Sequence, residues 1–309
     1  MKNLAECLML AWPSARRTTL WLLRLMLPIS LAVSLLQYFG IIAWAARYLD
    51  PLFVLMGLPG RAAIAFLTGA FVTTYAGLAV TMSLALTLRQ ATIVAVMTCI
   101  CHALPMECAV VRRCGSSFWG MAVLRLIMAV AVAFYLNALL PAMDQPFATA
   151  LSTDAPTLTA MLWTWLQGAL KTSLLILSII YILMVIQRLM ERYGLVEKIS
   201  RRLTPLMRLF GLPANAAYMW VVGNVLGISY GSAVMIDMEE KGLITRDEAN
   251  DVNYHLVMNH SMLEDTLVFA SMGVSAWWIL STRVLFALLV VWARRALNCL
   301  NNYGKLRGS

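Results

Sequence analysis

Charged residues are scarce in this sequence. They make up only 13% of the 309 residues, whereas 61% are hydrophobic, and a soluble globular protein carries about 25% charged residues. The scarcity excludes a disordered chain and argues against a soluble enzyme. The apolar residues form near-continuous runs of about 20 rather than alternating segments of about ten, which excludes a β-barrel. The composition therefore predicts an all-α polytopic membrane protein.

Two common signatures of catalysis are missing, and so is the pattern of a disulfide scaffold. The phosphate loop G-x-x-x-x-G-K-[ST] and the zinc-protease pattern H-E-x-x-H do not occur, and the loops are too short to form a catalytic domain. Four of the six cysteines gather in one apolar helix and its end, so no disulfide framework is expected. We therefore expect that the protein is not an enzyme; an intramembrane metal-dependent hydrolase is the alternative that these absences oppose.

The net charge of +9 comes from basic residues that flank the apolar runs. Lys and Arg are enriched in the cytoplasmic loops of membrane proteins. The charge therefore indicates the lipid bilayer as a partner and no nucleic acid. The first apolar run, 18–44, is too long for the core of a cleavable signal peptide.

An internal repeat divides the chain. At an offset of 154 residues, Gly57-Leu58-Pro59 falls on Gly211-Leu212-Pro213, and 12 of the 30 positions from 40 to 69 are identical. With small gaps the match continues to four further pairs: Tyr75 and Tyr230, Arg89 and Arg246, His102 and His260, and Glu107 and Glu264. The predicted domains are a first repeat (1–140), a linker (141–160) and a second repeat (161–309).

Both repeats are expected to hold the same elements. The spanning helices are 18–46, 90–111 and 118–140 in the first repeat and 162–187, 247–272 and 274–298 in the second. The Pro-containing connectors are 47–58 and 188–211. Each connector leads into a Gly-interrupted apolar stretch, 61–88 or 214–240.

The basic residues decide how the interrupted stretches lie. If both stretches span, ten loop charges lie on each side of the membrane. If both return as re-entrant hairpins, seventeen lie inside and only three outside, namely Arg47, Arg61 and Arg89. The positive-inside rule therefore favours six spans and two hairpins. Both termini then lie in the cytoplasm of a bacterial-type cytoplasmic (inner) membrane, 188–211 is a cytoplasmic interfacial helix, and 141–160 is a periplasmic-side linker.

Because each half then has an odd number of spans, three, the second half has the opposite orientation in the membrane to the first. Such inverted repeats recur in secondary transporters, with the solute site near the midplane. A duplicated scaffold is the alternative, although broken apolar helices are costly unless they line a cavity or pack in protein.

Ionisable residues near the expected midplane form the candidate site. Each costs about 3 kcal/mol to insert, yet one helix carries His102 and Glu107 and another carries His260 and Glu264. Inverted symmetry is expected to bring these two His–Glu dyads together. Two imidazoles and two carboxylates suit a divalent metal ion, a proton relay or hydrogen bonds to a polar solute.

Other polar residues extend the candidate site. They are Asn259 and Asp265 beside the second dyad, and Thr74, Tyr75, Asn224, Ser229 and Tyr230 at the hairpins. Half-helix ends in the hairpins offer carbonyls to cations and N–H groups to anions. Arg125 is expected to extend to the cytoplasmic end of its helix. Lys171 and Arg283 are expected either to pair with acids of the other half or to bind an anionic solute.

The two copies resemble a known family. A Gly-Leu-Pro start, an apolar arm, a Gly-rich break, a second arm and a polar-studded helix occur at 57–114 and again at 211–273. This pattern resembles the Gate, or nucleoside-recognition, domain of concentrative nucleoside transporters, ferrous iron transport protein B and spore maturation proteins A and B. The segment Asn259–Thr266 resembles a signature of membrane proteins in this group. The resemblance implies a transporter-like inverted repeat and leaves the substrate open.

The leading interpretation is a secondary carrier that moves a small solute by alternating access at the midplane. The His/Glu set favours a divalent cation as the substrate, and the resemblance favours a nucleoside-like organic solute. The alternative is a non-transporting scaffold or signalling component of a complex. The expected partners are the solute or ion and the bilayer, with a homo-oligomer left open; the one cofactor considered is a divalent metal ion.

Overall fold

The structure is a computed structural model that describes residues 2–147 and 157–307. Every regular element in these residues is a helix, and one isolated bridge joins Thr87 and Pro146. The α-helices are α1 (Lys2–Tyr38), α2 (Ile41–Leu55), α3 (Ala62–Phe71), α4 (Thr74–Ser83), α5 (Leu88–Ile100), α6 (Leu104–Arg113), α7 (Phe118–Leu139), α8 (Leu158–Arg192), α9 (Leu195–Leu209), α10 (Ala217–Leu226), α11 (Ile228–Glu240), α12 (Arg246–Asn259), α13 (Met262–Ser271) and α14 (Ala276–Arg307). A short 3-10 helix, η1 (Ala214–Ala216), precedes α10. The predicted all-α class is confirmed.

Within the described residues, five helical segments are long and apolar enough to cross a membrane. They are Glu6–Tyr38, Leu88–Arg113, Phe118–Leu139, Leu158–Arg192 and Ala276–Leu300. The protein is therefore a polytopic membrane protein. The sixth expected span, 247–272, is not among them, because its two helices carry charged residues: Arg246, Asp247 and Glu248 at the start of α12, and Glu264 and Asp265 at the start of α13.

The N-terminal helices differ from the sequence-based expectation. A single helix over 18–46 is wrong, because α1 ends at Tyr38 and α2 begins at Ile41. Gly40 joins the two helices with a φ of 73°. Glycine adopts this left-handed conformation readily because it has no Cβ. The connector expected at 47–58 is therefore largely part of α2.

Each Gly-interrupted stretch forms two short helices that pack against each other. The contact between α3 and α4 lies at Gly69 and Gly77, and the contact between α10 and α11 lies at Gly223 and Gly231. A Cβ added at Gly77 would lie only 2.8 Å from the Gly69 Cα, and one at Gly231 would lie 2.9 Å from the Gly223 Cα. Glycine therefore permits the close backbone approach in both halves.

Both helices that carry the ionisable residues of the candidate site are interrupted. The helix expected over 90–111 divides into α5 and α6, and its counterpart divides into α12 and α13. Ala103 and Ser261 lie at the two breaks with positive φ values of 43° and 50°. Their N–H groups donate to Gly69 O at 3.0 Å and to Gly223 O at 3.1 Å, respectively. Each hairpin thus satisfies a backbone group at the break of the same half, as the interior of a membrane protein requires.

The helices α5 and α12 start with the same capping box. The hydroxyl oxygens of Thr87 and Thr245 accept hydrogen bonds at 3.2 Å from the N–H groups of Gln90 and Glu248. The Gln90 and Glu248 side chains accept in return from the threonine N–H groups. The two interrupted helices therefore begin at equivalent positions of the repeat, each with the same cap.

Removing the second cap tests its contribution to stability. Thr245→Ala is expected to lower the free energy of unfolding by about 1 kcal/mol, because the Glu248 N–H loses its acceptor. Denaturation in detergent, followed by circular dichroism, measures the change. The control is Ser281→Ala, whose hydroxyl bonds only Trp277 O in its own helix, and its effect should stay below about 0.5 kcal/mol. Equal losses in the two variants would contradict the capping role.

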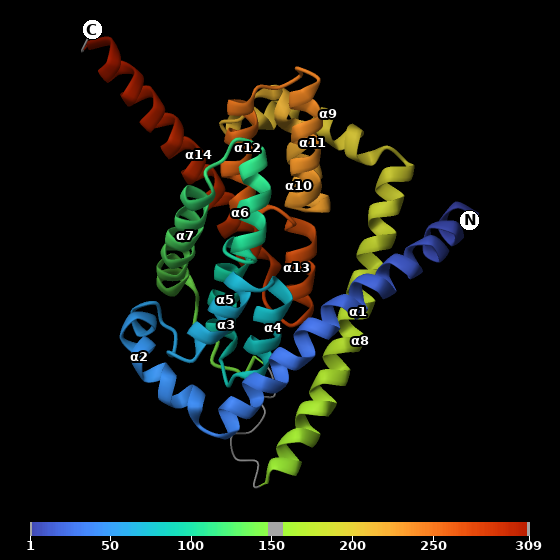
Figure 1. Ribbon diagram of the computed structural model, residues 1–309, viewed down its shortest axis with the longest axis vertical. Coiled ribbons are helices and arrows are strands. Elements are labelled where there is room, and N and C mark those ends of the chain that lie inside the picture. Colours follow the sequence, from blue (N-terminus) through green and yellow to red (C-terminus); the bar gives the residue numbers. More distant parts are fainter. Residues whose placement is uncertain (1, 148–156, 308–309) are drawn as a thin grey trace.

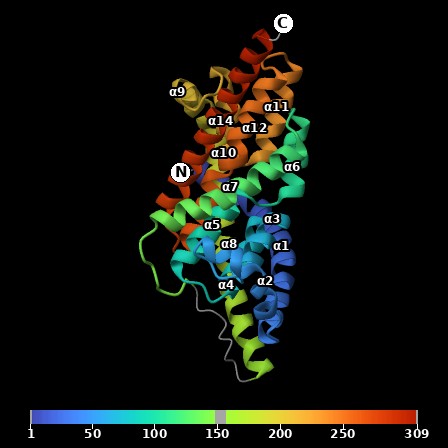
Figure 2. The same ribbon diagram turned by 90° about the vertical axis from the view of Figure 1, so that its left-hand side faces the viewer.

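The two Gly-interrupted helix pairs lie at different levels along the long axis of the molecule. Figure 1 shows α3 and α4 in the lower part and α10 and α11 in the upper part, and Figure 2 shows the same order from the side. The long helices α1 and α8 pack against each other. Helix α6 of the first half contacts α11 of the second, and α12 contacts α5 and α7. The halves therefore interlock at the level where their helices break.

The connector predicted to be an interfacial helix, 188–211, contains the end of α8 and all of α9. Val196, Ser200 and Met207 are buried, whereas Arg201 and Arg202 are exposed. Helix α9 packs against α10 near the upper end of the long axis (Figure 2). A buried apolar side and an exposed basic side are typical of a helix at a membrane interface.

Candidate functional site

Three side chains from the two halves converge in the interior. His102 lies in the break after α5, Glu107 lies in the first turn of α6, and His260 directly follows α12. Glu107 Oε1 lies 3.1 Å from the Nε2 atom of each histidine, and the two Nε2 atoms are 3.2 Å apart. All three side chains are buried. We call these residues the His–His–Glu cluster; it contains three of the four residues of the two predicted dyads.

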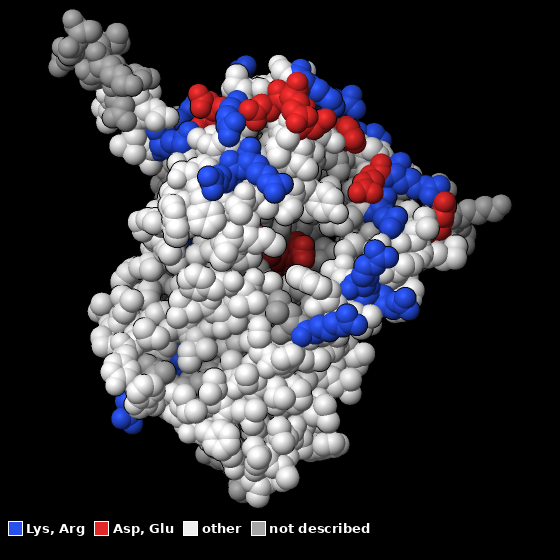
Figure 3. All heavy atoms as spheres, in the orientation of Figure 1, with Lys and Arg blue, Asp and Glu red and all other residues white. Residues whose placement is uncertain are grey.

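The fourth residue, Glu264, lies outside this cluster. Its Oε1 accepts a 2.6 Å hydrogen bond from the hydroxyl of Tyr75, which is buried in the first turn of α4 beside the buried Thr74. In the part of the chain that the structure describes, the group of close metal-ligand atoms contains His102, His260 and Glu107 only. The second dyad is therefore not formed as expected, because His260 faces the carboxylate of the other half. Figure 3 shows an acidic side chain at the bottom of a hollow at the level of α13.

Backbone carbonyls orient both imidazoles. His102 Nδ1 lies 2.9 Å from Thr98 O, and His260 Nδ1 lies 2.8 Å from Leu256 O. A carbonyl oxygen only accepts hydrogen bonds, so each Nδ1 carries a proton and donates it. In the neutral imidazoles both Nε2 atoms therefore present lone pairs to each other and to Glu107 Oε1.

A buried arginine holds the other oxygen of Glu107. Arg125 Nη1 lies 2.7 Å from Glu107 Oε2, and Arg125 Nε donates to Ile100 O at 2.8 Å. The exposed fraction of Arg125 is 0%. The expectation that Arg125 extends to the helix end is therefore wrong, because the ion pair and the carbonyl freed at the α5 break retain it inside. The pair leaves Oε1 of Glu107 to face the two histidines.

The second half contains an equivalent ion pair. Arg283 Nη1 lies 3.1 Å from Asp265 Oδ2, and Arg283 Nε donates to Met258 O at 3.2 Å. Arg283 thus pairs with an acid of its own half, not of the other half. The offset of 158 residues that relates His102 to His260 also relates Arg125 to Arg283 and Glu107 to Asp265. The alignment of Glu107 with Glu264 in the repeat is therefore wrong by one residue. The constant offset of 158 residues was the sequence signal that could have identified Arg125 and Arg283 as site residues.

The predicted residues Asn259 and Asn224 belong to a second buried polar group. Asn259 Oδ1 lies 3.1 Å from His255 Nδ1, which accepts a 3.0 Å hydrogen bond from Trp220 Nε1. Asn224 Nδ2 donates to Trp220 O at 2.9 Å. These contacts connect α10 to α12 beside the His–His–Glu cluster.

Two predicted hairpin residues lie away from the interior. Ser229 and Tyr230 are exposed on α11, and Tyr230 retains 65% of its accessible surface. The segment Gly227–Gly231 also matches the hydrolase pattern G-x-S-x-G. In hydrolases this serine lies on a turn from a strand to a helix, whereas Ser229 follows a turn between two helices. The match therefore does not create a nucleophile elbow.

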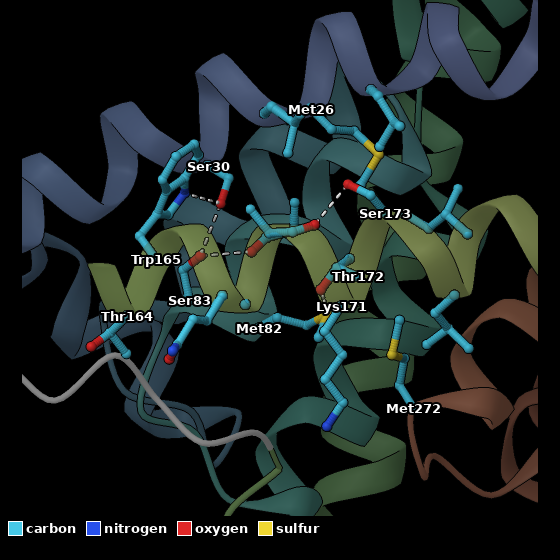
Figure 4. A pocket seen from close by; sticks show the side chains of 18 of the residues that line it. Met26, Ser30, Met82, Ser83, Thr164, Trp165, Lys171, Thr172, Ser173 and Met272 are labelled. Atoms are coloured by element: carbon cyan, nitrogen blue, oxygen red, sulfur yellow. Dashed lines mark hydrogen bonds between the residues drawn. The ribbon is translucent and has the colours of Figure 1, made fainter. Parts of the chain in front are cut away.

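A cavity of about 530 Å³ lies between α1, α4, α8 and α13. Trp165 Nε1 donates to Ser30 Oγ at 3.2 Å, and Ser30 Oγ lies 3.4 Å from Ser83 Oγ. Lys171 also lines the cavity, and Figure 4 shows its side chain extending away from these three residues. The cavity combines methionine and leucine side chains with hydroxyl groups and one ammonium group. Such a mixed lining is typical of sites for small organic molecules.

These observations define a class of protein. It is a polytopic helical membrane protein in which two similar halves have interrupted helices and share a buried centre of ionisable side chains. No disulfide links the six cysteines, all of which lie in the described residues.

Sequence comparison identifies the family. The profile of the Gate family, described as nucleoside recognition, matches residues 19–118, which form most of the first repeat. A protein of Bacillus subtilis (strain 168) described as "Uncharacterized membrane protein YvoD" is 31% identical over 289 residues, which cover 92% of this chain and 93% of the relative. The chain therefore belongs to the Gate family of membrane proteins. No solved structure matches it significantly.

Proposed function

We propose that the protein is a secondary carrier that moves a small solute by alternating access. The observation that carries the proposal is that both halves interrupt their helices at equivalent positions around one buried ionisable centre. Interrupted helices at the midplane are the means by which secondary transporters bind solutes and ions. Membership of the Gate family supports the same function.

In the proposed arrangement, α12 and α13 together form the sixth span, and the pairs α3–α4 and α10–α11 are re-entrant hairpins. The hairpins lie toward opposite ends of the long axis, which supports inverted repeats (Figure 1). Lys and Arg gather mainly over the upper part of one face, which supports a cytoplasmic location for that end in an inner membrane (Figure 3). Movement of one half against the other would open the centre to each side in turn. The cavity beside Lys171 favours a carrier over a scaffold with a fully packed interior.

Uptake into proteoliposomes tests the proposal. Radiolabelled Mn²⁺, Zn²⁺ and uridine serve as probes, since the substrate is either a divalent cation or a nucleoside-like solute. We expect wild-type protein to transport at least one probe faster than protein-free liposomes. His260→Ala and Glu264→Gln should each lower that rate at least tenfold, because each removes a group at the centre of the interlocked halves.

The control for the charge change is Glu240→Gln at the C-terminal end of α11, where Glu240 is exposed. It should transport at the wild-type rate. Wild-type rates in His260→Ala or Glu264→Gln would contradict the assigned site. Failure of all three probes to enter faster than through protein-free liposomes would contradict the proposed carrier function for these solute classes.

A further inference from the structure

We propose that the His–His–Glu cluster binds one divalent transition-metal ion, with His102 Nε2, His260 Nε2 and Glu107 Oε1 as its three protein ligands. The three atoms come from both halves of the repeat and all lie within 4.8 Å of one another in the interior. The inference concerns what occupies the cluster. It holds whether the ion is cargo, a coupling ion or a permanent part of the protein.

The first argument is the absence of a hydrogen-bond donor between these atoms. Each Nδ1 donates to a backbone carbonyl, so each neutral Nε2 is an acceptor, and an ionised carboxylate oxygen is always an acceptor. Three acceptors therefore face one another at 3.1–3.2 Å. Desolvated lone pairs at this distance repel unless a cation lies between them. One added proton would join only two of the three atoms, whereas a metal ion contacts all three.

The distances between the atoms form the second argument. In proteins, histidine nitrogen and carboxylate oxygen lie about 2.0–2.2 Å from a bound zinc ion. Three such ligands at roughly right angles around one ion are therefore about 3 Å apart. The observed separations of 3.1 and 3.2 Å match this arrangement. It occupies one face of the ion and leaves the opposite face open to water or a solute.

The groups behind the ligands form the third argument. Metal-binding histidines almost always donate their other N–H to a carbonyl or carboxylate, which fixes the tautomer, and both histidines do so here. Arg125 holds Glu107 Oε2, so the carboxylate offers a single oxygen to the ion. Two imidazoles and one carboxylate suit Zn²⁺, Mn²⁺, Fe²⁺ and Co²⁺ rather than Mg²⁺ or Ca²⁺, which prefer oxygen ligands.

Metal binding by the purified full chain tests the inference without any transport assay. The protein carries an affinity tag that contains no histidine, is loaded in detergent with Zn²⁺, Mn²⁺ or Co²⁺ alone, and is then desalted. Mass spectrometry should find close to one ion per chain for at least one metal. His102→Ala, His260→Ala and Glu107→Gln should each weaken binding at least tenfold. His255→Gln, which changes the one histidine of the three that is not a proposed ligand, should bind like wild type.

Two measurements on unaltered protein guard against variants that fail to fold. Added metal should raise the melting temperature of wild-type protein in proportion to the logarithm of its concentration, and a chelator should reverse the shift. Binding should also weaken as the pH falls, because protons compete for the Nε2 atoms. Wild-type protein that neither retains metal nor shows a thermal shift would overturn the inference. Retention of metal by the His102→Ala, His260→Ala double variant would overturn it as well.

A failure here is distinguishable from a failure of the carrier proposal. Uridine uptake without any bound metal would overturn the metal site and leave the carrier function intact. One retained ion per chain with no uptake of any probe would support the metal site and contradict transport of these solutes.

Discussion

Replacing Arg125 with methionine is expected to lower the free energy of unfolding by about 3–5 kcal/mol. Methionine has a similar length but no charge, so Glu107 would remain as a buried carboxylate without its ion-pair partner at 2.7 Å. Ile100 O would also lose its donor. Stability is measured by denaturation of the detergent-solubilised protein, followed by circular dichroism.

A double-variant cycle separates the cost of the unpaired charge from the loss of packing. Glu107→Gln removes the charge that Arg125 neutralises, so the double variant Arg125→Met, Glu107→Gln should recover part of the stability lost in Arg125→Met. Arg24→Met is the matched control, because Arg24 lies on α1 with an exposed side chain. It should change the free energy by less than about 0.5 kcal/mol. Similar small effects in Arg125→Met and Arg24→Met would show that the buried ion pair does not form.

The second large effect is expected at the glycine contacts of the hairpins. Gly77→Ala and Gly231→Ala should each destabilise the protein by about 1–3 kcal/mol. The added Cβ would lie 2.8 or 2.9 Å from a backbone Cα of the opposite arm, so the two arms must separate. Because Gly69 O and Gly223 O accept hydrogen bonds from the breaks beside His102 and His260, separation should also disturb the His–His–Glu cluster. Metal retention or uptake would then fall together with stability.

The control is a glycine in open surroundings. A Cβ at Gly168 of α8 meets no atom within 4 Å, and alanine favours a helix over glycine by roughly 0.5–1 kcal/mol. Gly168→Ala should therefore leave stability unchanged or raise it slightly. Thermal denaturation of the three variants side by side provides the comparison. If Gly77→Ala and Gly231→Ala have the same melting temperature as Gly168→Ala, the close helix contacts are not present.

The sequence by itself determined the class of this protein and predicted its division into two repeats. The low charge and long apolar runs led to a polytopic helical membrane protein, and the aligned Gly-Leu-Pro segments revealed two copies. The glycines that interrupt the two apolar stretches lie at the close helix contacts of the structure. The same segments led to the Gate family, which the comparisons confirm. These results depend on composition and on local sequence patterns, which can be recognised without knowing which residues meet in the fold.

Only the tertiary structure decided how the ionisable residues combine. The sequence placed His260 with Glu264 on one helix, whereas the fold places it against Glu107 of the other half. Pro105, in the first turn of α6, was a sequence signal for the break at Ala103. The break at Ser261 had no such signal, because no proline follows it and its left-handed conformation is stabilised by a carbonyl of a distant hairpin. Once the helices break, freed carbonyls and acids retain Arg125 and Arg283 in the interior. Long-range hydrogen bonds and ion pairs outweigh local helix preference here, because an unpaired polar group in an apolar interior costs on the order of a few kcal/mol.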